Sequence, residues 1–137
     1  ISCYNPDYID NITLFTKEER DLLEMLNNKI SLSKFLGNKS YVDKFGMDFI
    51  HTSAKIEGNA YSRNDTLTLL EYGRTAGGKR YNDAKMILNI RDAYELLIKE
   101  DLIVSKSTLK DLHYILSDEM VADDERAMPR DEEVIIK

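Results

Sequence analysis

The chain lacks three features that would point to special classes of protein: a second cysteine, a long apolar run and an excess of positive charge. Its single cysteine, Cys3, excludes a disulfide within the chain. No apolar run approaches the roughly 20 residues needed to cross a bilayer. The first residues also lack the basic and apolar regions of a secretory signal. We therefore expect a cytoplasmic protein with no membrane partner.

Acidic residues outnumber basic ones, and the formal net charge is −6. Phosphate binding depends on a basic face, so this balance argues against a nucleic-acid partner. The contents of 42% hydrophobic and 32% charged residues are ordinary for a soluble globular protein. At 137 residues the chain has the size of one domain. Residues 1–15 show no sustained periodicity and are expected to form a lead-in, followed by a single helical domain over residues 16–137.

Hydrophobic spacing and helix-end signals predict about five helices. The first begins at the capping box Thr16-Lys17-Glu18-Glu19, because the threonine hydroxyl and the Glu19 carboxylate can each satisfy a free amide. It is expected to continue to Leu36. The second begins at Ser40 and ends before Gly58, since glycine readily takes the left-handed conformation that stops a helix.

Three further helices follow. The third is short, over residues 65–73, with a cap within residues 62–65. The fourth, over residues 80–99, has apolar residues around much of its circumference and is expected to be the central, most buried helix. The fifth is capped by Ser105 or Ser107. Its inward-facing residues are expected to be Leu109, Leu112, Ile115 and Leu116.

The end of the chain changes character. Beyond Asp118 the sequence is acidic and irregular, and its last residues include the β-branched run Val134, Ile135 and Ile136. This run predicts one strand, which either pairs with residues outside this chain or offers an exposed edge to a partner. The predicted fold class is therefore an all-α domain of about five helices with a short terminal β-strand.

The best candidate for a functional site lies at the end of the second predicted helix. Ser53 and Glu57 are four residues apart and share one helix face. Because Glu57 is at the negative end of the helix dipole, a cation beside it would be favoured. Its preferred partner would be an arginine. The simpler interpretation is a solvated glutamate in the last turn.

Other motifs carry less. Residues 73–80 approach the P-loop pattern, but Arg80 replaces the hydroxyl that would bind magnesium, so an interhelical loop is preferred. His51 has no second ligand near it in the sequence, and His113 accompanies an apolar helix face, where histidine is usually a packing residue. We assign neither to chemistry and predict no metal site.

The segment Ser53-x-x-x-Glu57-Gly58-Asn59 resembles the inhibitory-helix motif (S/T)xxxE(G/N) of Fic-domain proteins. The resemblance continues as a series over about residues 49–137. Its later parts are a short helix at 65–73, the N-x-x-x-A of Asn89 and Ala93, the Leu112-His113 pair, and the R-x-x-x-V-x-I of Arg130, Val134 and Ile136, which opens the family's flap hairpin.

The resemblance implies transfer of AMP from ATP to a hydroxyl side chain of a target protein, with Mg2+ at the phosphates. The family's catalytic signature HxFx(D/E)GNGR is absent from this chain, so no catalytic residue is assigned and enzymatic activity of these residues alone is in doubt. By resemblance, Glu57 would pair with the second arginine of that signature and inhibit the enzyme. Ser53, Gly58 and Asn59 complete the inhibitory motif.

The flap start, over residues 127–137, would bind the target protein. By resemblance, Arg130, Val134, Ile135 and Ile136 would dock the target's backbone by strand addition. Two positions depart from the family, Ala127 where glycine is common and Pro129 where an aromatic residue is common. Self-association into a homo-oligomer is left open.

A second hypothesis is a non-enzymatic helical module. Such a module would present Glu57 to a separate catalytic chain, as the family's small antitoxin-like inhibitors do. Whether inhibition acts in cis or in trans is open. ATP and Mg2+ follow only from the resemblance, and the residues of this chain indicate no cofactor by themselves.

Overall fold

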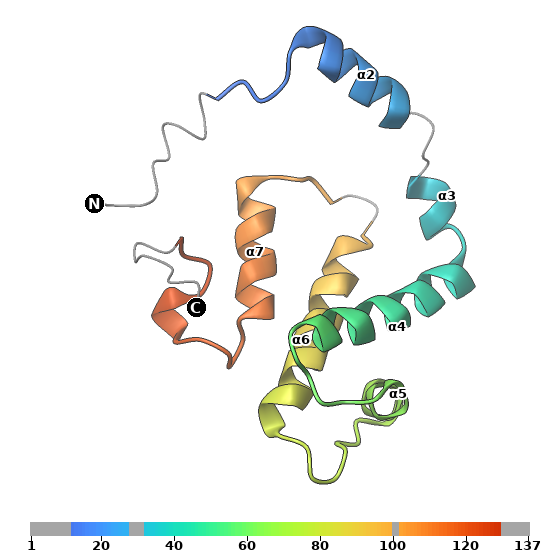
Figure 1. Ribbon diagram of the computed structural model, residues 1–137, viewed down its shortest axis with the longest axis vertical. Coiled ribbons are helices and arrows are strands. Elements are labelled where there is room, and N and C mark those ends of the chain that lie inside the picture. Colours follow the sequence, from blue (N-terminus) through green and yellow to red (C-terminus); the bar gives the residue numbers. More distant parts are fainter. Residues whose placement is uncertain (1–11, 28–31, 100–101, 130–137) are drawn as a thin grey trace.

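The computed structural model describes residues 12–27, 32–99 and 102–129, which form helices joined by loops and contain no strand. The predicted all-α class is confirmed for this part of the chain. The terminal strand at Val134–Ile136 lies outside the described residues. The described residues form six α-helices and one 3-10 helix (Figure 1): α2 (Lys17–Asn27), α3 (Leu32–Leu36), α4 (Lys39–Ile56), α5 (Arg63–Tyr72), α6 (Tyr81–Leu97), α7 (Lys106–Leu116) and η1 (Asp123–Glu125).

The first predicted helix is described as two. The capping box forms as expected at the start of α2, where the Thr16 amide donates to Glu19 at 2.8 Å and the Glu19 amide donates to the Thr16 hydroxyl at 3.2 Å. The helix ends at Asn27, and α3 begins five residues later at Leu32, with residues 28–31 outside the described part. No residue of α2 is buried, so its apolar side chains pack on no other described helix.

The second predicted helix is α4, but its cap is Asn38 and not Ser40. The Asn38 side-chain oxygen accepts a hydrogen bond from the Tyr41 amide at 3.1 Å. Asparagine caps as well as serine does, and its position here starts the helix two residues earlier than a cap at Ser40 would. At the other end Gly58 has a φ of +82°, which confirms it as the helix stop.

The short third helix is α5. Ser62 and Asp65 form a reciprocal capping box at its start, and Gly73 ends it in the left-handed conformation. The cap predicted at residues 62–65 and the glycine stop are therefore both confirmed. The loop that follows is tied to the body, because the Ala76 amide donates to the Tyr61 hydroxyl at 3.1 Å.

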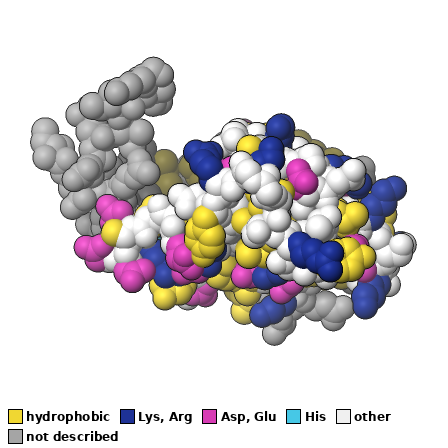
Figure 2. Space-filling model, turned by 90° about the horizontal axis from the view of Figure 1, so that it is seen from below, with side chains coloured by type: hydrophobic (Ala, Val, Ile, Leu, Met, Phe, Trp, Pro, Cys, Tyr) yellow, Lys and Arg dark blue, Asp and Glu magenta, His cyan; other side chains and the backbone are white. Residues whose placement is uncertain are grey.

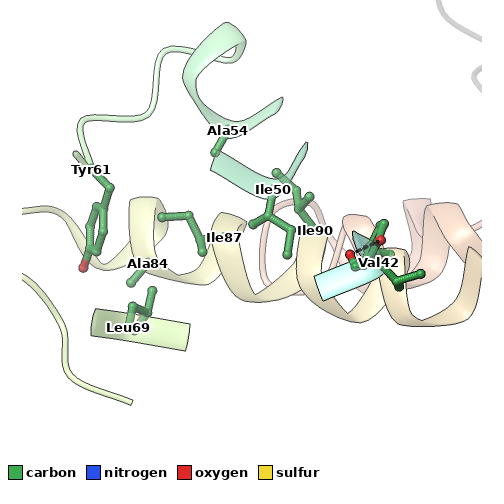
Figure 3. Close-up of a cluster of buried hydrophobic side chains, with 9 residues drawn as sticks. Val42, Ile50, Ala54, Tyr61, Leu69, Ala84, Ile87 and Ile90 are labelled. Atoms are coloured by element: carbon green, nitrogen blue, oxygen red, sulfur yellow. Dashed lines mark hydrogen bonds between the residues drawn. The ribbon is translucent and has the colours of Figure 1, made fainter. Parts of the chain in front are cut away.

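The central helix is α6, which packs against α4, α5 and α7. Ile87 on α6 is fully buried and lies between α4 and α5, with Ile50 and Ile90 nearby (Figure 3). The buried apolar cluster consists of Val42, Ile50, Ala54, Tyr61, Leu69, Ala84, Ile87, Ile90 and Tyr94. The prediction that residues 80–99 form the most buried helix is confirmed.

The fifth predicted helix is α7, and Ser105 rather than Ser107 caps it. The prediction that its leucines face inward is wrong in part, since no residue of α7 is buried and Leu109 is 68% exposed. Its apolar stripe points to a groove with no described occupant. Hydrophobic side chains also reach the surface between charged ones on the face shown in Figure 2.

Candidate functional site

An apolar groove of about 590 Å3 lies between α4, α6 and α7. One wall comes from the second half of α4, the opposite wall from α7 and the residues after it, and α6 runs between them. The lining residues are Phe49, Ser53, Ile56, Glu57, Met86, Ile90, Ala93, Tyr94, Leu97, Leu112, Leu116 and Met120. The groove is therefore a hydrophobic trough of a size that suits one helix face or a similar apolar segment.

Among the described residues that line this groove, Glu57 is the only charged one, and Ser53 lies one helical turn before it. The structure thus brings together the two residues that the sequence singled out by their spacing. The other hydroxyl in the lining belongs to Tyr94, and it donates to the carbonyl of Val42 at 2.9 Å. Ser53 and Glu57 are consequently the polar side chains available to a molecule in the groove.

The position of Glu57 follows from how α4 ends. Its amide still donates to the carbonyl of Ser53 at 3.3 Å, and the Gly58 amide donates to the carbonyl of Lys55 at 3.0 Å. Glu57 is therefore the cap residue, placed against the last free carbonyls of the helix. The partial negative charge there adds to that of the carboxylate, so a cation is the favoured neighbour.

Gly58 and Asn59 have another role. Asn59 is buried, its amide nitrogen donates to the carbonyl of Asp83 at 2.7 Å, and its oxygen accepts from the Tyr61 amide at 3.0 Å. The first bond fastens the chain that leaves α4 to the first turn of α6, and the second orders the loop itself. Neither residue lines the groove, so within the motif they orient Glu57 by fixing the helix end.

The predicted target-docking residues Arg130, Val134, Ile135 and Ile136 lie outside the described residues. The segment that precedes them is attached to α7. The Ala127 amide donates to Nδ1 of His113 at 2.9 Å, and the Arg126 guanidinium lies 3.8 Å from the centre of the Tyr114 ring. His113 is thus a structural acceptor here, which agrees with leaving it out of the chemistry.

A charge cluster reinforces this attachment. Arg126 also pairs with Asp118 at 2.9 Å, and Lys85 of α6 pairs with the same carboxylate. The hydrogen bond from Lys85 and the nearby Arg126 charge lower the pKa of Asp118, and the Asp118 hydrogen bond raises the pKa of Lys85. Sequence reasoning missed this cluster, because its members are 33 residues apart and no local pattern connects Lys85 with Asp118.

The other candidates from the sequence, the loop over residues 73–80 and His51, do not form a binding site among the described residues. The loop over residues 73–80 follows helix α5 and not a strand, which removes the structural context of a P-loop. Nδ1 of His51 lies 3.4 Å from the Thr66 hydroxyl, a local contact between α4 and α5. Within the described ranges no three acidic, histidine or cysteine side chains gather as a metal site would require.

Comparison of the chain with protein-family models, curated proteins and solved structures finds no significant match. Among the helices of the described part, none combines the length and the apolar character needed to span a bilayer. The site must therefore be interpreted from its own geometry and from the motif resemblance.

Proposed function

We propose that this chain is the regulatory part of a Fic-type protein AMP-transferase, in which α4 is the inhibitory helix and Glu57 the inhibitory residue. The observation that supports this best is that Glu57 is the one charged side chain that the described part of the chain contributes to an apolar groove, with Ser53 one turn away. A cation beside this carboxylate is favoured because Glu57 is the C-cap of α4, where the partial negative charge of the helix end adds to that of the side chain.

The occupant of the groove follows from its chemistry. A segment that fills it needs an apolar face and one cation opposite Glu57. By the Fic resemblance, this segment carries the signature HxFx(D/E)GNGR, and its second arginine pairs with Glu57. Ser53 supports that pair by hydrogen bonding.

Inhibition then follows from electrostatics. An arginine held by Glu57 cannot bind the terminal phosphate of ATP, and the carboxylate disfavours a triphosphate next to it. The substrate pair in this proposal is ATP with Mg2+ and a protein hydroxyl. The flap start, over residues 127–137, would position the target backbone by strand addition.

The test is the substitution Glu57→Gly in a protein that contains both this chain and the signature segment. Transfer of radiolabelled AMP from ATP to the protein itself should rise at least about tenfold, which corresponds to about 1.4 kcal/mol in productive ATP binding. Glu71→Gln, at an exposed position of α5, is the matched control and should leave the transfer unchanged. Unchanged or lower transfer in Glu57→Gly would refute the role of Glu57.

A second candidate is inhibition in trans, and it is favoured by the fact that no described residue fills the groove. Here the chain is a helical module that binds a separate catalytic polypeptide. A tagged version of this chain should then capture a separately encoded protein that carries HxFx(D/E)GNGR. Leu112→Glu, which places a charge in the groove lining, should abolish the capture. Capture that is unaffected by this substitution would exclude the groove as the binding surface.

A further inference from the structure

We propose that two copies of this chain associate by exchanging α2, so that the apolar stripe of α2 in one copy packs on an aromatic face of the other. The aromatic face consists of Phe35, Tyr41 and Phe45. None of these three residues lines the groove that contains Glu57, so the inference goes beyond the proposed function and does not depend on it.

The first half of the argument is the state of α2. This helix is well formed, with a reciprocal capping box, yet none of its residues is buried and it packs on no other described helix. Its apolar stripe is made by Leu22, Leu23 and Leu26, with Leu22 52% and Leu26 46% exposed. Figure 1 shows α2 standing apart from the helices around α6. An amphipathic helix of this length is marginal in water unless its apolar face is covered.

The second half is the aromatic face. Phe35 lies edge-on to Tyr41 and to Phe45, with ring centres 5.5 Å apart in both pairs. The three rings form one continuous surface over the end of α3 and the first half of α4. Tyr41 is 56% and Phe45 45% exposed, so the surface presents apolar area without a described partner. Contiguous exposed apolar side chains of this kind mark interaction surfaces.

Charge and spacing match the two surfaces. Residues 17–27 carry two basic and four acidic side chains, a net charge of −2. Residues 34–45, which include the aromatic face, carry three lysines and one aspartate, a net charge of +2. Leu22 and Leu26 are one turn apart, as are Tyr41 and Phe45, so both rows repeat at about 6 Å. Opposite charges then flank an apolar contact of matching length.

A second copy is the occupant because of how α2 is attached. Only residues 28–31 separate it from α3, and the helix extends away from the body instead of lying on it. An extended element on a short connection is the form that exchange between identical chains uses, and two-fold symmetry makes the contact twice. Docking of α2 on its own chain and binding of an unrelated helix are the alternatives that the test must separate.

Cross-linking between two differently sized full-length chains tests the proposal. Both chains carry Cys3→Ser, which removes the one native cysteine. The first carries Leu26→Cys, and the second, with an added tag, carries Phe45→Cys. A short bismaleimide should give the mixed dimer at high yield. The matched control replaces Leu26→Cys by Glu24→Cys, on the opposite side of α2, and should reduce that yield at least fivefold.

The cross-linking pattern distinguishes exchange of α2 between chains from docking of α2 on its own chain. A mixed dimer that depends on Leu26→Cys supports the exchange. A chain carrying both cysteines that links only to itself shows that α2 docks on its own body, and this result overturns the proposal, as does the absence of any link.

Sedimentation of the full chain gives the second measurement. The dimer should dissociate at least tenfold more readily in the double variant Leu22→Glu/Leu26→Glu, whereas Glu24→Gln should leave the dissociation constant within twofold. A wild-type chain that stays monomeric at high micromolar concentration overturns the proposal. Because Glu57→Gly leaves this surface untouched, it should not change the dimer, which separates failure of this proposal from failure of the inhibitory role.

Discussion

The two ends of α6 differ in how completely they are covered. Around Ala84 and Ile87 the helix is packed by α4 and α5, and the buried Asn59 side chain donates a hydrogen bond to the carbonyl of Asp83 in its first turn. Around Ala93 and Leu97 the same helix borders an open groove, where Leu97 is 40% exposed. At the covered end the apolar side chains are already buried within the chain. At the open end Ala93 and Tyr94 are buried, but Leu97 keeps exposed apolar area that no described residue covers.

This contrast separates stability from recognition. The covered end supplies the packing that holds the fold, and the open end presents an apolar surface with Glu57 at its edge. Substitutions at the covered end should therefore reduce the free energy of unfolding, whereas substitutions at the open end should mainly affect binding.

The largest effect is expected for Ile87→Ala, because this side chain is fully buried. Its removal should lower the free energy of unfolding by about 2–5 kcal/mol, from lost transfer energy and the cavity left behind. Leu97→Ala, on the same helix at the groove, is the matched control and should cost about 1 kcal/mol or less. Urea unfolding followed by circular dichroism measures both. Equal losses would abolish the distinction between the two ends.

The next effect is expected for Gly46→Ala, which probes how closely α4 approaches α6. A Cβ at this position would lie 2.5 Å from a ring carbon of Tyr94. The ring cannot easily withdraw, because its hydroxyl donates to the carbonyl of Val42. We expect a loss of about 1–3 kcal/mol. Gly77→Ala, where a Cβ meets nothing within 4 Å, should change the unfolding midpoint little. An unchanged free energy of unfolding in Gly46→Ala would mean that α4 and α6 can move apart without loss of stability.

Asn59→Ala tests the polar closure of the covered end. It leaves the carbonyl of Asp83 and the amide of Tyr61 without their partner, for an expected loss of about 1–3 kcal/mol. Asn82→Ala, at an exposed position of α6, serves as the control. Hydrogen exchange at the Tyr61 amide should also accelerate in Asn59→Ala. Unchanged exchange would show that this bond does not hold the chain after α4.

The smallest expected effect is a change in the acid dependence of stability in Asp118→Asn. The pKa of Asp118 is lowered by its hydrogen bond with Lys85, so its contribution to stability is complete above its unfolded pKa of about 3.9 and is lost as the pH falls through the lower folded value. Asp118→Asn should therefore flatten the acid dependence of the unfolding midpoint below about pH 4. Asp48 and Asp65, whose pKa values are also lowered, remain in both proteins, so the difference isolates Asp118. Identical acid profiles would contradict this assignment.

The local features of the fold could be predicted because they depend on neighbours in the sequence. The capping boxes at Thr16 and Ser62, the stops at Gly58 and Gly73 and the central position of α6 all follow from residue type and spacing within a few positions. The cap of α4 was predicted at Ser40 but lies at Asn38. Two good capping residues stand close together here, and only the backbone conformation decides between them.

The candidate site was only half predictable. The four-residue spacing placed Ser53 and Glu57 on one face of a helix, and this holds in α4. The spacing could not reveal that this face borders a groove, because the opposite wall comes from α7, more than 50 residues later. The inward orientation expected for Leu109 likewise failed, since periodicity identifies an apolar stripe but not whether anything covers it.

The sequence by itself determined the helical class, the ends of most helices and the shared face of Ser53 and Glu57, because these depend on interactions between residues a turn or less apart. Only the tertiary structure decided what surrounds them. It buried Asn59 against α6, left the stripe of α7 open, and joined Lys85 to Asp118. Those outcomes depend on how helices distant in the sequence pack against one another. Local sequence patterns do not specify which side chains make these long-range contacts.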